Sequence, residues 1–297
     1  MTRKLSDILN NEQQNKKANK VVRKDYKQLN DLHVPSTKNE PSTGIIEVVD
    51  SRFYPDMYET YRMFANRYNL DHKNFILTNG CENALRIALL AIKPRSMLIE
   101  NPTWGMVEPI CAGLEIPYQE VNYHFIQNKT FRMDNISHDK KAWLYTTETY
   151  NNFFKHENYD AEFYNNVIID ETYTLNELLR NIEPEDRIFK KNEIIIGSFS
   201  KFGGCGLRLG YILFNECWNE KMQLLREQYI SPLASKYVIN YNGPDKTAII
   251  NMITRKCEYP IVSKHLCYTT IAVDNEISVL NYKEFTVDNK RFIRIGV

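Results

Sequence analysis

Residues 194–210 read IIIGSFSKFGGCGLRLG, an apolar run followed at once by a dense set of polar groups. The run Ile194–Ile196 is typical of a buried strand, because β-branched side chains favour strands. Two serines, Lys201, a glycine-rich stretch and Arg208 follow it and lead into a second apolar run. In α/β sheets, ligands bind at the carboxyl ends of the strands. The segment therefore predicts an α/β fold with a ligand site just beyond the first run.

Similar apolar runs recur along the chain and alternate with helical patterns. Continuous apolar strands that alternate with helices are typical of a mainly parallel, buried sheet flanked by helices. We therefore expect an α/β domain of this kind. The apolar runs are residues 75–77, 97–99, 142–145, 167–169, 194–196 and 209–214, and the helical patterns are residues 57–68, 82–92, 157–166 and 216–229.

The pattern divides the chain into three parts. Residues 1–44 carry many charges and amides with almost no apolar periodicity, which predicts a solvated N-terminal arm. Residues 45–230 carry the alternation of strands and helices and are expected to form a large domain. After Ser231 the pattern changes to helix-like segments and weaker strands, so residues 231–297 are expected to form a small α+β domain.

Composition limits the classes of function. The 297 residues include 38 Lys or Arg and 37 Asp or Glu, for a formal charge of +1, and 43% are apolar. This balance is ordinary for a globular protein and argues against a dedicated nucleic-acid binder or membrane-surface protein. The apolar runs are too short to span a membrane. Six scattered cysteines without a C-x-x-C pair argue against structural zinc and are typical of a reducing cytosol, so we expect a cytoplasmic protein with no metal site.

Four predicted strand ends supply complementary chemistry. A glycine turn before Cys81 opens a helix, and free backbone N–H groups at a helix start suit a phosphate. Trp104 is a flat ring, Asp170 a carboxylate and Lys201 an amine. Each feature also has a plainer interpretation: a common helix start, a core aromatic, a helix cap and a surface lysine. Together they match pyridoxal 5′-phosphate, which needs a phosphate site, a stacking ring, a carboxylate at its ring nitrogen and a Schiff-base lysine.

Six motifs in order resemble those of the class I and II aminotransferases, the fold-type I pyridoxal-phosphate enzymes, and most of all the histidinol-phosphate aminotransferase branch. The resemblance extends from about Tyr54 to Arg294 and implies a fold-type I transferase. It also implies a homodimer with a shared active site. The motifs are YPD at 54–56, NGCEN at 79–83, NPTWGM at 101–106, IIDETY at 168–173, SFSK followed by GLRLGY at 198–211, and RFIRIGV at 291–297.

The resemblance implies a role for each matching residue. Lys201 would be the Schiff-base lysine and would carry the proton between the substrate α-carbon and the cofactor. Asp170 would pair with the cofactor's ring nitrogen, and Arg294 would hold the substrate α-carboxylate in a bidentate clamp. The other implied cofactor contacts are Tyr54 from the neighbouring subunit, Cys81, Glu82, Ser198, Ser200 and Arg208 at the phosphate, Trp104 stacked on the ring, and Tyr173 and Asn151 at the phenolate oxygen.

Several departures from the family pattern bear on activity and substrate. Lys201 and Arg208 are seven residues apart, one fewer than is usual in the family. Residues 146–152 lack the proline and glycine that normally surround the family's asparagine. The segment after Lys201 is shorter than usual, so the small domain is expected to be trimmed. Asn281 stands near the place of an arginine that holds the substrate phosphate in the histidinol-phosphate branch, which argues against histidinol phosphate as substrate.

The leading hypothesis is an aminotransferase that moves an amino group from an amino acid or amine to a 2-oxo acid or another carbonyl acceptor. A decarboxylase of the threonine-phosphate type shares these motifs, because the cofactor stabilises whichever carbanion the site aligns. A non-catalytic paralogue is a third interpretation, favoured by the trimmed small domain. The sequence names neither donor nor acceptor. The basic residues of the N-terminal arm indicate either a solvated tail or a dock for an acidic partner.

Overall fold

The structure is a computed structural model that describes the chain in nine segments. Only the backbone is described at some positions, Lys201 and Arg294 among them. The arm at residues 1–44, Asn151 and Asn281 lie outside the described residues, so the expectations for them stay predictions. The described segments are residues 54–126, 130–147, 154, 156–173, 189–201, 205–240, 261–264, 268–273 and 283–296.

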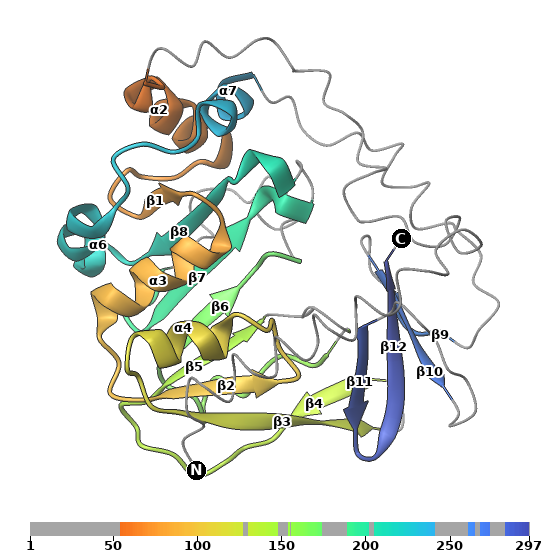
Figure 1. Ribbon diagram of the computed structural model, residues 1–297. Helices are drawn as coiled ribbons and strands as arrows, with labels where there is room; N and C mark the ends of the chain where they lie inside the picture. Colours follow the sequence, from red (N-terminus) through yellow and green to blue (C-terminus); the bar gives the residue numbers. More distant parts are fainter. Residues whose placement is uncertain are drawn as a thin grey trace, which may run out of the picture.

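Eight strands form one mixed sheet in the order β1-β8-β7-β6-β5-β2-β3-β4 (Figure 1). β3, β2, β5, β6 and β7 are parallel neighbours, whereas β8 runs antiparallel between β7 and β1. This confirms the predicted α/β fold with a mainly parallel sheet. The strands are β1 (Phe75–Thr78), β2 (Met97–Asn101), β3 (Tyr118–Ile126), β4 (Thr130–Met133), β5 (Trp143–Thr147), β6 (Val167–Asp170), β7 (Glu193–Ser198) and β8 (Gly210–Phe214).

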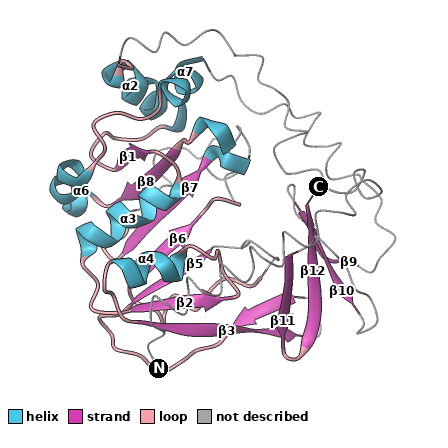
Figure 2. Cartoon of the chain, viewed as in Figure 1, coloured by secondary structure: helices cyan, strands magenta, loops and turns pink. Residues whose placement is uncertain are grey.

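Helices cover both faces of this sheet, as predicted (Figure 2). On one face, α3 (Cys81–Ile92), α4 (Val107–Gly113) and α6 (Asn219–Leu225) bury their apolar side chains against the central strands. On the other face, α2 (Met57–Tyr68) and α7 (Pro232–Asn240) pack over β1 and β8. These helices fix the sheet from both sides, so the strand ends that carry the motifs are held by a buried core.

Local sequence explains where α2 begins. The side chain of Asp56 caps the helix by accepting a hydrogen bond from the Glu59 amide at 3.0 Å. Such a cap satisfies one of the free N–H groups of the first turn. Along the helix, Thr60, Phe64 and Tyr68 are buried at helical spacing. The predicted helix at 57–68 is therefore confirmed.

Two predicted helices differ from the structure. The helix expected at 157–166 is wrong, because the Asp160 carboxylate accepts the amides of Glu162 and Phe163 and closes a turn instead. The helix expected at 216–229 is shorter. A 3-10 turn at Glu216–Trp218 precedes α6, which stops before an extended residue at Arg226.

The C-terminal part forms a separate antiparallel sheet in the order β11-β12-β10-β9, whereas the division into a large and a small domain stays a prediction. This sheet lies beside the β3–β4 edge of the large sheet (Figure 1). The Phe292 ring on β12 contacts the Phe125 and Phe131 rings at centroid distances of 5.2 and 5.3 Å. The boundary at residue 231 stays a prediction. The strands are β9 (Ile261–Lys264), β10 (Tyr268–Val273), β11 (Lys283–Val287) and β12 (Lys290–Gly296).

His124 connects the two sheets where they lie side by side. His124 on β3 lies between Asp288, in the β11–β12 turn, and Asp134, each with a nitrogen–oxygen distance of 2.7 Å. The hydrogen bonds to Asp288 and then Asp134 raise the His124 pKa above its ordinary value. Because the folded pKa is raised, the stabilisation is complete below the unfolded pKa of about 6.5 and is lost as the pH rises through the folded value.

His124→Gln is expected to lower stability most at about pH 6, by a few tenths to about 1 kcal/mol, since the pair is half exposed. The difference from wild type should shrink as the pH rises, because the wild-type imidazole then loses its charge. Thermal unfolding of both proteins across this range measures it. His72→Gln is the matched control, because His72 lies beside Asp71 on the surface and joins no second sheet. A difference that does not change with pH would show that His124 acts through shape alone.

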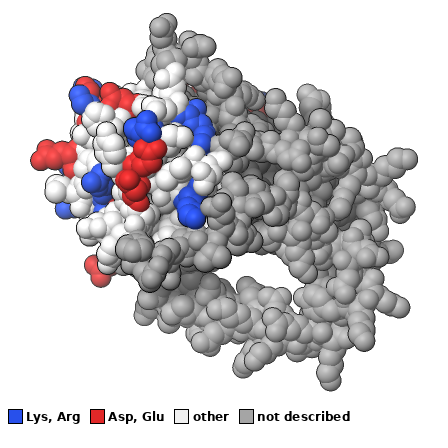
Figure 3. Space-filling view, turned by 90° about the horizontal axis from the view of Figure 1, so that it is seen from above, with Lys and Arg blue, Asp and Glu red and all other residues white. Residues whose placement is uncertain are grey.

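On the face seen in Figure 3, charges of both signs are mixed among the described residues. This fits the nearly balanced formal charge of +1. Within the described residues, no helix combines the length and apolar character needed to cross a membrane.

Candidate active site

Asp170 lies at the carboxyl end of β6 and is the centre of the candidate site. Its side chain is buried and accepts three hydrogen bonds. The Tyr145 hydroxyl donates at 2.7 Å, the Thr172 amide at 2.8 Å and the Cys81 thiol at 3.7 Å. All three are neutral donors. Because none of these donors is a cation, the carboxylate is available to a cationic group that binds beside it.

Two of these donors are held in their protonated forms. Burial, and next the charge of Asp170, raises the pKa of Tyr145 well above its ordinary value. The same causes raise the pKa of the Cys81 thiol. Cys81 is the first residue of α3. Its side chain contacts Asp170, and its backbone amide belongs to the start of the helix. Tyr145 could not be identified from the sequence, because it lies inside an apolar run that predicts only a strand.

Two further motif residues are buried beside Asp170. Glu171 is 6% exposed and accepts a hydrogen bond from the Tyr211 hydroxyl at 3.1 Å. Burial, and next the charge of Glu171, raises the Tyr211 pKa well above its ordinary value. Tyr173 is 7% exposed. The motif IIDETY thus places two carboxylates and a phenol at one end of β6.

A turn of two residues, Asn79 and Gly80, lies between β1 and α3 and forms the second part of the site. Gly80 caps α3 with φ +91° and without a side-chain hydrogen bond, so the first N–H groups of the helix lack a side-chain cap. The Arg208 guanidinium lies over this turn and donates to the Asn79 carbonyl at 3.4 Å. A Cβ at position 80 would come within 2.7 Å of Arg208 Nη2. The turn and the arginine therefore make one cationic face, which suits an anion.

The segment that follows α6 holds this turn through hydrogen bonds. The Glu227 carboxylate accepts the Asn79 amide and the Asn83 side-chain amide, both at 2.6 Å. Asn79 also bonds to the backbone of Tyr229 and Ser231. These contacts hold the turn in one conformation before any ligand binds.

β8 approaches this turn so closely that only glycine fits at position 210. A Cβ there would lie 2.6 Å from the Gly80 carbonyl carbon and 2.7 Å from the Thr78 hydroxyl oxygen. Gly210→Ala is therefore expected to push the turn away and to lower stability by about 1–3 kcal/mol. It should also weaken binding of a phosphate-bearing ligand. Gly206→Ala is the matched control, because a Cβ at Gly206 would meet no atom within 4 Å.

Titration with the ligand and denaturant unfolding measure both effects of Gly210→Ala. Equal affinity and stability in the two alanine variants would show that the turn does not depend on the close approach of β8.

The serines and Lys201 follow directly after β7. Ser198 is 3% exposed, and its hydroxyl donates to the Leu209 carbonyl and accepts the Ser200 amide. A 3-10 turn at Phe199–Lys201 then carries the backbone of Lys201 past the end of the sheet. Asp170 and Ile196 are register partners on neighbouring strands, so Lys201 follows the strand beside Asp170. Residues 202–204 lie outside the described residues.

Trp104 lies in the loop between β2 and α4. It is half-buried and packs against the apolar core that includes the buried side chains of α3. Glu100, the second-last residue of β2, carries a buried carboxylate that is 1% exposed. Burial is the largest influence on Glu100 and raises its pKa to about 7. Burial also lowers the pKa of the nearby His156 to about 4. Glu100 could not be singled out from the sequence, because it follows the apolar run at residues 97–99 and most of its hydrogen-bond donors come from other strands.

The remaining predicted residues lie further from this centre or face other partners. Tyr54 is 78% exposed and stacks on Tyr229 with ring centroids 4.3 Å apart. The Glu82 side chain pairs with Arg86, so only its backbone belongs to the helix start. Arg294 lies on β12, where its backbone pairs with Lys283 and Thr270.

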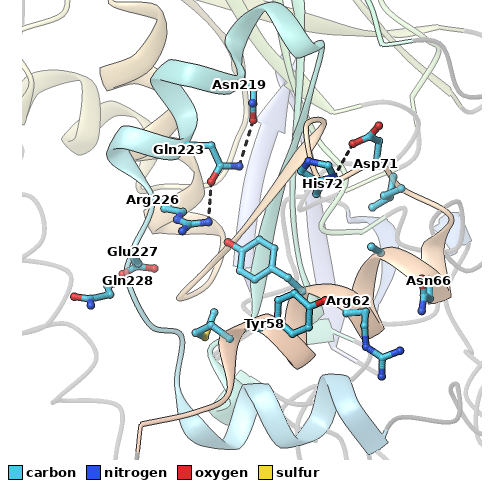
Figure 4. Close-up of a pocket in the computed structure, with 14 residues that line it drawn as sticks. Tyr58, Arg62, Asn66, Asp71, His72, Asn219, Gln223, Arg226, Glu227 and Gln228 are labelled. Carbon is cyan, nitrogen blue, oxygen red and sulfur yellow. Dashed lines mark hydrogen bonds and ion pairs between the residues drawn. The ribbon is translucent and has the colours of Figure 1, made fainter.

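A pocket of about 720 Å³ lies between α2 and α6 and contains none of the predicted site residues. Tyr58, Arg62, Gln223 and Arg226 line it (Figure 4). Glu227 also lines this pocket. The same side chain therefore borders the pocket and holds the Asn79–Gly80 turn of the candidate site.

The geometry fits pyridoxal 5′-phosphate. Asp170 offers a buried carboxylate to a protonated ring nitrogen, and the Tyr145 hydroxyl, the Cys81 thiol and the Thr172 amide that donate to it are all neutral. The glycine turn and Arg208 offer N–H groups and a cation to a phosphate. Trp104, Tyr173 and the backbone of Lys201 border the same edge of the sheet.

Comparison with known proteins agrees with this geometry. The sequence matches the family described as aminotransferase class I and II over residues 25–241. One relative, histidinol-phosphate aminotransferase 2 from Nitrosococcus oceani, is 27% identical over 167 residues, which make up 52% of this chain and 45% of that protein. The match thus spans less than half the length of that relative.

Two solved structures show the shared fold. L-threonine-O-3-phosphate decarboxylase from Porphyromonas gingivalis superimposes with a TM-score of 0.59 at 16% identity, covering 82% of this chain and 87% of that one. Histidinol-phosphate aminotransferase from Sinorhizobium meliloti in complex with pyridoxal 5′-phosphate gives a TM-score of 0.52 at 19% identity, covering 64% and 56%. Because the family match extends over most of the chain, the protein belongs to the class I and II aminotransferases, and its cofactor is pyridoxal 5′-phosphate.

Proposed function

We propose that the protein transfers an amino group from an amino acid or amine to a 2-oxo acid or another carbonyl acceptor, with Lys201 as the reacting amine. The observation that carries the proposal is the buried Asp170 carboxylate with its three neutral donors, beside the glycine turn and one strand away from Lys201. When bound, pyridoxal 5′-phosphate withdraws the electron pair left on the substrate α-carbon after one of its bonds breaks.

Each residue of the site has one task in this proposal. Asp170 holds a proton on the ring nitrogen, and its donors fix the direction of the carboxylate. The amides at the start of α3, with Arg208, Ser198 and Ser200, bind the phosphate and so set the position of the ring. The Lys201 amine takes the proton from the substrate α-carbon and returns it to the cofactor side, which is general acid–base catalysis by a positioned group.

Substrate binding and assembly complete the proposal. Arg294 on β12 binds the substrate α-carboxylate, Trp104 stacks on the cofactor ring, and Tyr173 and Asn151 bind its phenolate oxygen. The exposed Tyr54 reaches the phosphate of a second copy in a cytoplasmic homodimer. Its 78% exposure supports this, because a large aromatic side chain open to solvent is available to a partner.

Product analysis tests the reaction type. The wild-type protein with cofactor is offered single amino acids together with a 2-oxo acid, and the products are quantified. The proposal expects equal amounts of a new oxo acid and a new amino acid, without release of CO₂. Release of CO₂ from the donor would instead support a decarboxylase of the threonine-phosphate type. Cofactor binding with neither product, across a panel that includes amines and phosphorylated donors, would support a non-catalytic paralogue.

A further inference from the structure

Glu100 is a buried carboxylate that the proposed reaction does not use. It lies near the carboxyl end of β2 and accepts hydrogen bonds from three different segments. Its Oε2 accepts the Tyr123 hydroxyl at 2.8 Å, the Thr146 hydroxyl at 3.0 Å and the Thr147 amide at 3.1 Å. Its Oε1 accepts the Thr103 hydroxyl at 3.3 Å. Four donors around one buried side chain form an organised polar cluster.

The tautomer of His156 determines whether the Thr147 hydroxyl donates to His156 or to Glu100. The Nδ1 of His156 lies 2.7 Å from the Glu157 carbonyl, which only accepts, so Nδ1 carries the ring hydrogen. Since the lowered pKa keeps His156 neutral, its Nε2 is an acceptor. The Thr147 hydroxyl, 2.7 Å from Nε2, therefore donates to His156 and not to Glu100. The donors to Glu100 are the four named above.

These donors connect Glu100 to both sides of the candidate site. Thr103 directly precedes Trp104 in the loop after β2. Thr146 and Thr147 end β5, directly after Tyr145, whose hydroxyl donates to Asp170. Tyr123 belongs to β3 and connects the cluster to the strand on the other side of β2. One carboxylate thus fastens the loop that carries the aromatic ring to the strand that carries a donor to Asp170.

We propose that Glu100 is a positioning residue that fixes the Trp104 loop against the end of β5. The role rests on the proposed function, because the loop matters here as the support of the ring that stacks on the cofactor. Other ionisable groups around Glu100 are Tyr123 on β3, Tyr145 on β5 and Asp170 on β6, with His156 behind Thr147. None of these is a cation at neutral pH, so Glu100 acts by accepting hydrogen bonds and not through a salt bridge.

Hydrogen–deuterium exchange of the full chain without cofactor tests the role directly. Thr103→Val keeps the side-chain shape and removes one donor, so exchange at residues 103–107 is expected to become about tenfold faster, the scale of one hydrogen bond. Exchange at residues 143–147 should stay as in wild type. Glu100→Ala should speed exchange in both segments, because it removes the shared acceptor.

Two further variants separate positioning from general loss of stability. Glu100→Gln should restore slow exchange, since its amide oxygen can take the place of Oε2 and its NH₂ group can donate to the Thr103 hydroxyl. Glu171→Ala removes a similarly buried carboxylate that accepts a hydrogen bond from the Tyr211 hydroxyl. It should lower stability while leaving exchange at residues 103–107 unchanged.

Titration with pyridoxal 5′-phosphate adds a second readout. Thr103→Val is expected to bind the cofactor about tenfold more weakly than wild type, because the stacking ring is then less well held. Wild-type exchange at residues 103–107 in both Thr103→Val and Glu100→Ala would overturn the positioning role, whatever the affinities. If wild type itself fails to bind the cofactor, the proposed function fails, and the exchange data alone still decide the role of Glu100.

Discussion

Asp170→Asn is expected to lower the rate of amino transfer about a hundredfold to a thousandfold while the variant still binds pyridoxal 5′-phosphate through Lys201. Asn keeps the size of the side chain and one acceptor for the Tyr145 hydroxyl, but it carries no charge. Removing a preorganised electrostatic partner from a buried site typically has an effect of this size. Single-turnover kinetics, with the visible band as a control for binding, measure the change.

The neighbouring tyrosines provide the comparison for this variant. Tyr145→Phe removes a donor to Asp170, and Tyr211→Phe removes an equally buried donor to Glu171. Both should lose stability of about 1 kcal/mol, the net worth of one hydrogen bond. Only Tyr145→Phe should also slow amino transfer. Full activity in Asp170→Asn would contradict the role of the carboxylate at the ring nitrogen.

Glu100→Gln is expected to change how stability depends on pH. Burial raises the Glu100 pKa from about 4.5 to about 7, so the folded protein holds this proton more tightly than the unfolded chain. Stability therefore falls as the pH rises from the unfolded to the folded value. A difference of this size corresponds to about 3 kcal/mol. Gln does not titrate, so the variant lacks this loss.

Urea unfolding of both proteins at about pH 5 and pH 8 measures the effect. The variant should gain about 2–3 kcal/mol relative to wild type between the two conditions. His156 titrates in the opposite sense, because its lowered pKa makes stability rise with pH. It is present in both proteins and largely cancels in the difference. Parallel pH profiles would show that Glu100 does not titrate in this range.

The buried strands could be predicted from the sequence because their apolar runs are continuous. β1, β5, β6, β7 and β8 are buried along almost their whole length, so period and composition agree. β3, next to the edge strand β4, has only two buried residues among its nine, and its many polar side chains gave no continuous apolar run. At residues 157–166 apolar spacing mimicked a helix, whereas the Asp160 turn decided the backbone.

Part of the candidate site could also be predicted. Cys81, Asp170, Ser198 and Arg208 lie in motifs next to strand ends, and the roles proposed for them rest on the resemblance to the family. Tyr145 and Glu100 could not be identified in the same way, because their importance comes from contacts between strands. Thr147 and Asp170 are register partners on β5 and β6, so the side chains at these strand ends meet only once the sheet has formed.

The visible absorption spectrum with pyridoxal 5′-phosphate, recorded for wild type, Lys201→Ala and Lys190→Ala, tests the central claim most directly. Lys190 lies exposed near the opposite end of β7, paired with Glu193, and serves as the matched lysine. The account predicts a yellow band in wild type and in Lys190→Ala that is missing in Lys201→Ala, because only Lys201 bonds to the cofactor. A wild-type protein without a band, or a band that survives in Lys201→Ala, would contradict it.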